Sequence, residues 1–99
     1  MLTKQQIERI KTVLSQCGFI KEAWLFGSYA KNQETPSSDL DIMYNKIDGV
    51  HYGLFALMGT INKLEEETGK KIDLVHIPSM HERVRQSAEK HKVKIYEKK

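Results

Sequence analysis

The spacing of the hydrophobic residues changes along the chain and marks an alternation of helices and strands. Near the N-terminus the spacing is three and four residues, which is typical of an amphipathic helix. The residues that show it are Ile7, Ile10, Val13 and Leu14. Thr3 followed by Gln6 is typical of a capping box. We therefore expect a helix from Thr3 or Lys4 to about Gln16.

Further along, short apolar runs alternate with two more helical repeats. The runs predict strands at residues 20–26, 39–44, 71–77 and 93–96. The repeats predict helices from Val50 or Tyr52 to about Thr68, and from Met80 or His81 to about His91. Ser79 with Glu82 predicts a second capping box in front of the last helix. This order of elements predicts an α/β (α+β) fold, in which helices pack on a small mixed sheet.

Each of these two later helices has an apolar stripe that should face the sheet. The stripe of the first consists of Leu54, Leu57, Met58, Ile61 and Leu64. The stripe of the second consists of Val84 and Ala88. We expect both stripes to be buried.

Length and composition fit one soluble globular domain, residues 1–99. A chain of 99 residues can bury a modest core but not a second one. No apolar run approaches the ~20 residues that a membrane helix needs, and the N-terminus lacks the basic-then-apolar pattern of an export signal. The single cysteine, Cys17, cannot form an internal disulfide. We therefore expect a cytoplasmic protein with no membrane partner.

The net charge of +3 is unevenly distributed. Residues 70–99 carry nine of the sixteen basic side chains and four of the thirteen acidic ones. A basic surface of this kind could meet a nucleotide triphosphate, a nucleic acid or an acidic protein, or simply remain solvated. The segment lacks the series of interleaved aromatic residues with which proteins stack single-stranded nucleic acid. We therefore do not expect nucleic acid to be the partner.

Two aspartates alternate with apolar residues where the second strand begins. Because side chains in a strand alternate between faces, Asp39 and Asp41 should share one face, and Leu40 and Ile42 the other. Two neighbouring carboxylates repel each other unless water or a hard cation separates them. Mg²⁺ is usually held by one or two carboxylates together with substrate phosphates. The pattern therefore predicts a metal–phosphate site at the edge of the sheet.

A third acidic residue, Asp73, interrupts the otherwise apolar run 72–75. A buried carboxylate without a partner is unfavourable, so its presence in a strand needs a reason. If this strand lies beside the second one, Asp73 reaches the same site as Asp39 and Asp41. Two metal ions held there could clamp the attacking and the leaving oxygen of a phosphoryl or nucleotidyl transfer. We therefore expect Asp39, Asp41 and Asp73 to be both metal ligands and catalytic residues.

The first strand ends at a Gly-Ser pair, which is the candidate phosphate site. Gly27 lets the backbone turn sharply and approach a ligand closely. If residues 29–31 open a short helical turn, the amides near Ser28 face outward toward an anion. Lys31 adds a positive charge for phosphate, and Asn32 can adopt the left-handed conformation that ends such a turn. We expect Gly27, Ser28 and Lys31 to bind the phosphates of a nucleotide.

The combination of Gly27-Ser28, ten further residues and Asp39-Leu40-Asp41 resembles a known family. It is similar to the DNA polymerase beta-like nucleotidyltransferases, and so short a chain resembles their minimal nucleotidyltransferase (MNT) branch, the MntA-type antitoxins paired with HEPN toxins. The resemblance covers nearly the whole chain. It implies that the Gly-Ser pair holds the terminal phosphates of the nucleotide, and that Asp73 completes the triad and accepts the proton of the incoming hydroxyl. Family members commonly have arginine where this chain has Lys31, which keeps the charge but loses the two-pronged contact.

The resemblance also implies a reaction. AMP would pass from ATP to a hydroxyl, with two Mg²⁺ ions as cofactors, and the acceptor would be a tyrosine on a partner HEPN ribonuclease toxin that the modification silences. Two alternatives remain open. The chain could be a non-catalytic antitoxin that neutralises the toxin by binding, or a nucleotidyltransferase for small molecules, although relatives of the second kind usually carry an added substrate domain.

Overall fold

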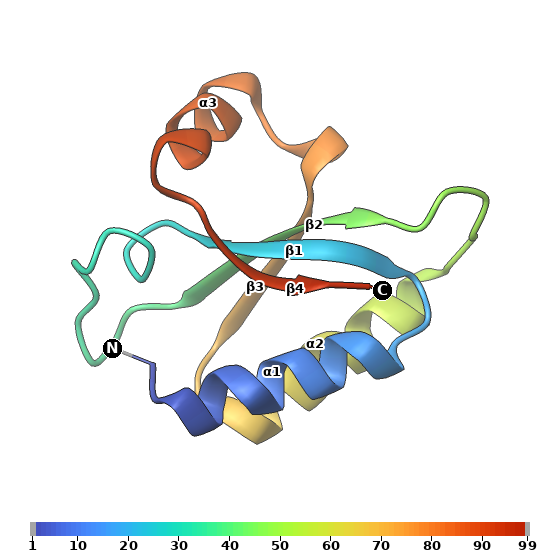
Figure 1. The fold of residues 1–99 in the computed structure, drawn as a ribbon, viewed down its shortest axis with the longest axis horizontal. Coiled ribbons are helices and arrows are strands. Elements are labelled where there is room, and N and C mark those ends of the chain that lie inside the picture. Colours follow the sequence, from blue (N-terminus) through green and yellow to red (C-terminus); the bar gives the residue numbers. More distant parts are fainter. Residues whose placement is uncertain (1, 99) are drawn as a thin grey trace.

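Four strands form one mixed sheet with helices on both faces (Figure 1). The structure is a computed structural model and describes residues 2–98. The strands are β1 (Ile20–Phe26), β2 (Leu40–Lys46), β3 (Ile72–His76) and β4 (Val93–Glu97). Their order is β3-β2-β1-β4; β1 is antiparallel to β2 and β4, whereas β2 and β3 are parallel. The predicted α/β architecture with a small mixed sheet is confirmed.

The helices divide unequally between the two faces of the sheet. They are α1 (Lys4–Gln16), α2 (Leu54–Thr68) and α3 (Glu82–His91), with a short 3-10 turn, η1 (Ile77–Ser79), after β3. Figure 1 shows α1 and α2 side by side along one face and α3 on the opposite face. Within residues 2–98, no helix has the length and apolar character needed to cross a membrane.

The first helix begins where the sequence predicts. The Thr3 hydroxyl accepts a hydrogen bond from the Gln6 amide at 3.0 Å, and the Gln6 side chain accepts one from the Thr3 amide at 2.9 Å. These bonds satisfy two of the amides that a helix start leaves unpaired. Gly18 follows the helix with φ of 83°, a conformation that glycine adopts without a steric penalty. The chain then turns directly into β1.

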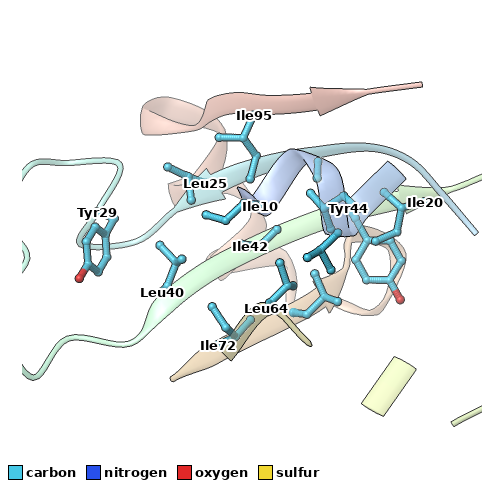
Figure 2. Close-up of a cluster of buried hydrophobic side chains, with 14 of the residues drawn as sticks. Ile10, Ile20, Leu25, Tyr29, Leu40, Ile42, Tyr44, Leu64, Ile72 and Ile95 are labelled. Atoms are coloured by element: carbon cyan, nitrogen blue, oxygen red, sulfur yellow. The ribbon is translucent and has the colours of Figure 1, made fainter. Parts of the chain in front are cut away.

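The larger core lies between the sheet and the pair α1–α2 (Figure 2). Leu40 and Ile42 of β2 are fully buried there. Because alternate residues of a strand face opposite sides, Met43 joins a smaller cluster under α3, together with Phe26 and Ala88. The same alternation directs Asp41, the acidic residue of β2, toward the α3 face.

The starts of α2 and α3 differ from the predictions. Residues 50–53 are not helical, because Tyr52 stacks on Phe19 with ring centroids 4.1 Å apart and the chain stays extended up to Gly53. The second capping box is wrong. Ser79 belongs to η1, and the side chain that caps α3 is His81, whose Nδ1 accepts from the Arg83 amide at 3.3 Å.

The apolar stripes of α2 and α3 are only partly buried. Leu54 is 70% exposed and Met58 47% exposed, because α2 meets the larger core through the face that carries Leu57, Ile61 and Leu64. Val84 is 49% exposed, so α3 reaches the sheet through Ala88. The adjoining Phe55, which was not predicted to be buried, is also solvent-exposed.

Because α2 packs unequally along its length, replacing leucine by alanine should lower the free energy of unfolding by different amounts at two of its positions. Leu64→Ala should destabilise the protein by roughly 2–4 kcal/mol, because it leaves a cavity in the larger core. Leu54→Ala, on the same helix, should change stability by less than about 0.5 kcal/mol. Urea unfolding of the two variants measures both values. Equal losses would mean that the first turn of α2 is packed against the protein in solution.

Candidate active site

Two of the predicted carboxylates lie directly opposite each other on neighbouring strands. In the parallel register of β2 and β3, Asp41 pairs with Asp73, as Leu40 pairs with Ile72. Paired residues on adjacent strands project to the same face, so both carboxylates lie on the α3 face of the sheet. Asp39 comes one residue before β2, and its charge also acts on Asp41. The structure therefore brings the three predicted acidic residues to one place.

The electrostatics of Asp41 reflect this arrangement. Partial burial raises the pKa of its carboxyl to about 6, and the neighbouring charges of Asp73 and Asp39 add to the shift. Burial acts by removing water from the charged form, and the two like charges act by repulsion. Negative charge on Asp41 is therefore unfavourable in the folded protein, and a cation would relieve it.

The donor set fits a hard cation in chemistry and charge. Carboxylate oxygens are the ligands that Mg²⁺ prefers, and the like charges around Asp41 favour a positive ion there. Within residues 2–98, however, no group of three or more histidine, cysteine, aspartate or glutamate side chains has the arrangement of a metal site. As they lie, the three carboxylates therefore do not form such a group.

The glycine turn touches this acidic cluster. Phe26, the last residue of β1, pairs with Asp41, and Gly27 follows with φ of 72°. A Cβ atom added to Gly27 would lie 2.2 Å from Oδ2 of Asp41. Only a residue without a side chain allows the turn and the carboxylate to approach this closely. A phosphate bound on the turn would therefore lie beside the carboxylates.

The segment after Gly27 forms the single helical turn that the sequence predicts. The Lys31 amide donates to the Gly27 carbonyl at 3.2 Å, and the Gln33 amide donates to the Ser28 carbonyl at 2.9 Å. Asn32 ends the turn with φ of 56°, so the predicted left-handed conformation is confirmed. Ser28 is half-buried and Lys31 is exposed.

Tyr29 anchors this turn in the larger core. Its side chain is 8% exposed and joins the larger core at the loop end of the sheet (Figure 2). The ammonium group of Lys70 lies 5.4 Å from the centre of its ring. No local pattern marks Tyr29 as buried, because it stands in a polar loop and its contacts come from distant segments.

A four-stranded mixed sheet that carries clustered carboxylates beside a tight glycine turn defines a candidate nucleotide site. The chain belongs to the polymerase beta nucleotidyltransferase family, whose model matches residues 8–99. The predicted enzyme class, a nucleotidyltransferase, and the predicted fold are thereby confirmed. The matching region includes the glycine turn and all three aspartates.

Individual relatives are similar over most of the chain. The "Putative protein adenylyltransferase MJ1379" of Methanocaldococcus jannaschii is 35% identical over 79 residues, which cover 79% of this chain and 78% of that protein. A second protein of the same organism, the "Putative protein adenylyltransferase MJ0435", is 37% identical over 62 residues, or 63% of this chain and 64% of that one. Both matches are to proteins described as transferring adenylyl groups to protein.

Solved structures share the fold. A crystal structure of a toxin–antitoxin with AMP-PNP aligns with a TM-score of 0.76 and 20% identity, and covers 94% of this chain and 74% of that chain. A tri-AMPylated Shewanella oneidensis HEPN toxin in complex with MNT antitoxin aligns with a TM-score of 0.69 and 19% identity, over 94% and 71% of the two chains. These likenesses establish the architecture of the chain.

The contact between Gly27 and Asp41 can be tested by a matched pair of substitutions. Gly27→Ala and Gly49→Ala both place alanine at positive φ (72° and 78°), and each should cost about 1 kcal/mol of stability. A Cβ at position 49 meets nothing within 4 Å, whereas at position 27 it displaces the Asp41 carboxylate. Calorimetric titration with Mg²⁺ and ATP should therefore show weaker binding for Gly27→Ala only. Equal binding by both variants would contradict a role for this contact.

The raised pKa of Asp41 predicts an unusual pH dependence of stability. The pKa of Asp41 in the folded protein, about 6, lies above the ordinary value of 3.8, so folding favours the protonated carboxyl. The stability that the protonated carboxyl contributes is lost as the pH rises through 6. Asp41→Asn should therefore be more stable than the original protein at pH 7, with a difference that narrows by pH 5. Thermal unfolding at both values measures it.

The control for this experiment is Asp48→Asn, which changes an exposed aspartate outside the cluster. Its stability should follow that of the original protein at both pH values. A stability difference for Asp41→Asn that stays constant from pH 5 to pH 7 would show that the carboxyl titrates normally.

Proposed function

We propose that this protein transfers AMP from ATP to a hydroxyl group of a partner protein. The observation that carries the proposal is the pairing of Asp41 with Asp73 beside Gly27, on the face of the sheet that carries α3. Membership of the nucleotidyltransferase family supports the reaction class, and the names of the curated relatives support a protein as the acceptor. The crystal structure of the similar toxin–antitoxin with AMP-PNP supports ATP as the donor.

The proposed reaction assigns a role to each predicted residue. The acceptor oxygen attacks the α-phosphorus, the bond from this phosphorus to the bridging oxygen breaks, and pyrophosphate leaves. Asp73 takes the proton of the attacking hydroxyl, and Gly27, Ser28 and Lys31 bind the phosphates. Asp39, Asp41 and Asp73 would hold two Mg²⁺ ions, which supply positive charge to the phosphates and to the attacking oxygen.

The proposed acceptor is a tyrosine of a HEPN-type toxin, which the modification would silence in the cytoplasm. Support comes from the solved structure of similar fold in which an MNT antitoxin is in complex with a tri-AMPylated HEPN toxin. A hydroxyl of a folded partner also suits a site in which Asp73 is exposed to solvent. One small domain of this size offers little surface of its own for a long acceptor, so the partner would complete the site.

A second candidate function is neutralisation by binding alone. The observation that favours it is an exposed apolar surface at the start of α2, where Leu54 is 70%, Phe55 94% and Met58 47% exposed. Contiguous exposed apolar residues of this kind often mark protein contacts. In that case the complex would neutralise the toxin without any transfer, and the carboxylates would be dispensable.

One experiment separates the two functions. Co-expression with the HEPN partner, or incubation with ATP and Mg²⁺, should increase the intact mass of the partner by whole AMP units. Asp39→Ala combined with Asp41→Ala should abolish the gain, because it removes two of the three carboxylates. Asp48→Ala, which removes an exposed aspartate elsewhere, should leave the gain unchanged.

One outcome would contradict the transfer, and another would show that neutralisation does not need it. A partner that keeps its mass with the original protein under these conditions would rule out the transfer. A double alanine variant that still neutralises the toxin at equal stoichiometry would show that binding suffices.

A further inference from the structure

A cavity of about 300 Å³ lies between α3 and the glycine turn. It lies on the side of the sheet that carries α3, because most of its lining residues belong to that helix. One wall consists of Phe26, Gly27 and Lys31, and the other includes Arg83, Ser87 and His91 of α3. The three helix residues are four positions apart, so they follow one face of α3. None of the residues on the helix wall belongs to the site that the sequence predicts.

The cavity adjoins the carboxylates. Phe26 pairs with Asp41 across β1 and β2, so the two side chains project to the same face. Gly27 lines the cavity and also approaches the Asp41 carboxylate so closely that a Cβ would lie 2.2 Å from Oδ2. A ligand that passes over Gly27 therefore has the acidic cluster on one side and the α3 wall on the other.

The charges of the two sides are opposite. The cavity is lined by Lys31, Arg83 and His91 but by no aspartate or glutamate. Two other basic residues on or next to α3 are paired: Arg85 lies 4.0 Å from Glu82, and Lys92 lies 2.7 Å from Glu89. Within residues 2–98, no carboxylate lies within ion-pair distance of Lys31, Arg83 or His91. Their basic groups therefore remain available to an anion.

We propose that Arg83, with His91 and Lys31, binds the β- and γ-phosphates of the nucleotide, which leave as pyrophosphate. This inference rests on the proposed function, because it extends the same ATP site. The polyphosphate would run from the acidic cluster, over Gly27, into the cavity. Arg83 presents a planar fork of donors that suits phosphate, and so supplies from α3 the two-pronged contact that Lys31 cannot make.

The apolar floor of the cavity strengthens these contacts. Phe26 is 9% exposed and Ala88 5% exposed, and both line the cavity next to the basic residues. Charges interact more strongly beside apolar groups than in open water, because less solvent screens them. Ser87 adds a hydroxyl donor on the same helix face. The wall therefore combines donors, positive charge and reduced screening, which is what binding of a polyphosphate requires.

The test compares two arginines of the same helix. Arg83→Ala should weaken binding of ATP, measured by calorimetry with Mg²⁺ on the full chain, by roughly tenfold, the usual effect of losing one charge-assisted contact. Arg85→Ala should leave the affinity unchanged, because Arg85 does not line the cavity. Inorganic tripolyphosphate, which has no base or sugar, should lose affinity for Arg83→Ala to a similar degree. Arg83→Lys should recover part of the loss, and circular dichroism should confirm that all variants fold.

The other outcomes separate this inference from the proposed function. If the original protein binds ATP and Arg83→Ala binds it equally well, the α3 wall does not hold the nucleotide and the proposed function stands. If Arg83→Ala weakens ATP but not tripolyphosphate, the wall contacts the nucleoside and the phosphate assignment is wrong. If the original protein does not bind ATP at all, the proposed function itself fails.

Discussion

The repulsion between two carboxylates held in register on parallel strands is the constraint on which the rest of the structure depends. Asp41 and Asp73 cannot separate without breaking the pairing of β2 with β3. That pairing is secured on the other face by four buried residues, Leu40, Ile42, Ile72 and Leu74. Burying each contributes roughly 1.5–3 kcal/mol, whereas two charges near a protein surface repel by only a few kcal/mol. The hydrophobic face therefore outweighs the repulsion.

The sequence predicts this part of the molecule well because the relevant signals are local. Alternation along β2 separates Asp39 and Asp41 from their apolar neighbours, and an aspartate in a strand of apolar residues marks Asp73. β1 is confirmed at both ends, and the other strands shift by one or two residues. The roles of these residues in catalysis stay predictions, whereas the position of Asp41 and Asp73 on one face follows from the strand register.

The features that the sequence does not predict depend on how elements pack. The helical repeat of α2 is correct, but it cannot show that Leu54 and Met58 lie outside the part of the stripe that reaches the core. Residues 50–53 also fit a helical repeat, and the stacking of Tyr52 on Phe19 keeps them extended instead. Ser79 and Glu82 have the spacing of a capping box, but Ser79 is still part of the 3-10 turn η1, which contains Pro78. The helix α3 therefore begins only at Glu82, and His81 caps it. In each case a tertiary contact or a neighbouring turn overrides a valid local signal.

The two faces of the sheet differ in packing, and this difference explains where chemistry can occur. The face covered by α1 and α2 holds the larger core and leaves little room for polar groups. On the opposite face, α3 contributes only Ala88 to a small cluster with Phe26 and Met43. A helix with so little apolar contact stabilises the fold weakly, and the rest of its sheet-facing surface can carry polar and basic side chains. The lightly packed face can therefore hold the acidic cluster and a basic wall at close range, because few apolar side chains compete for the space between them.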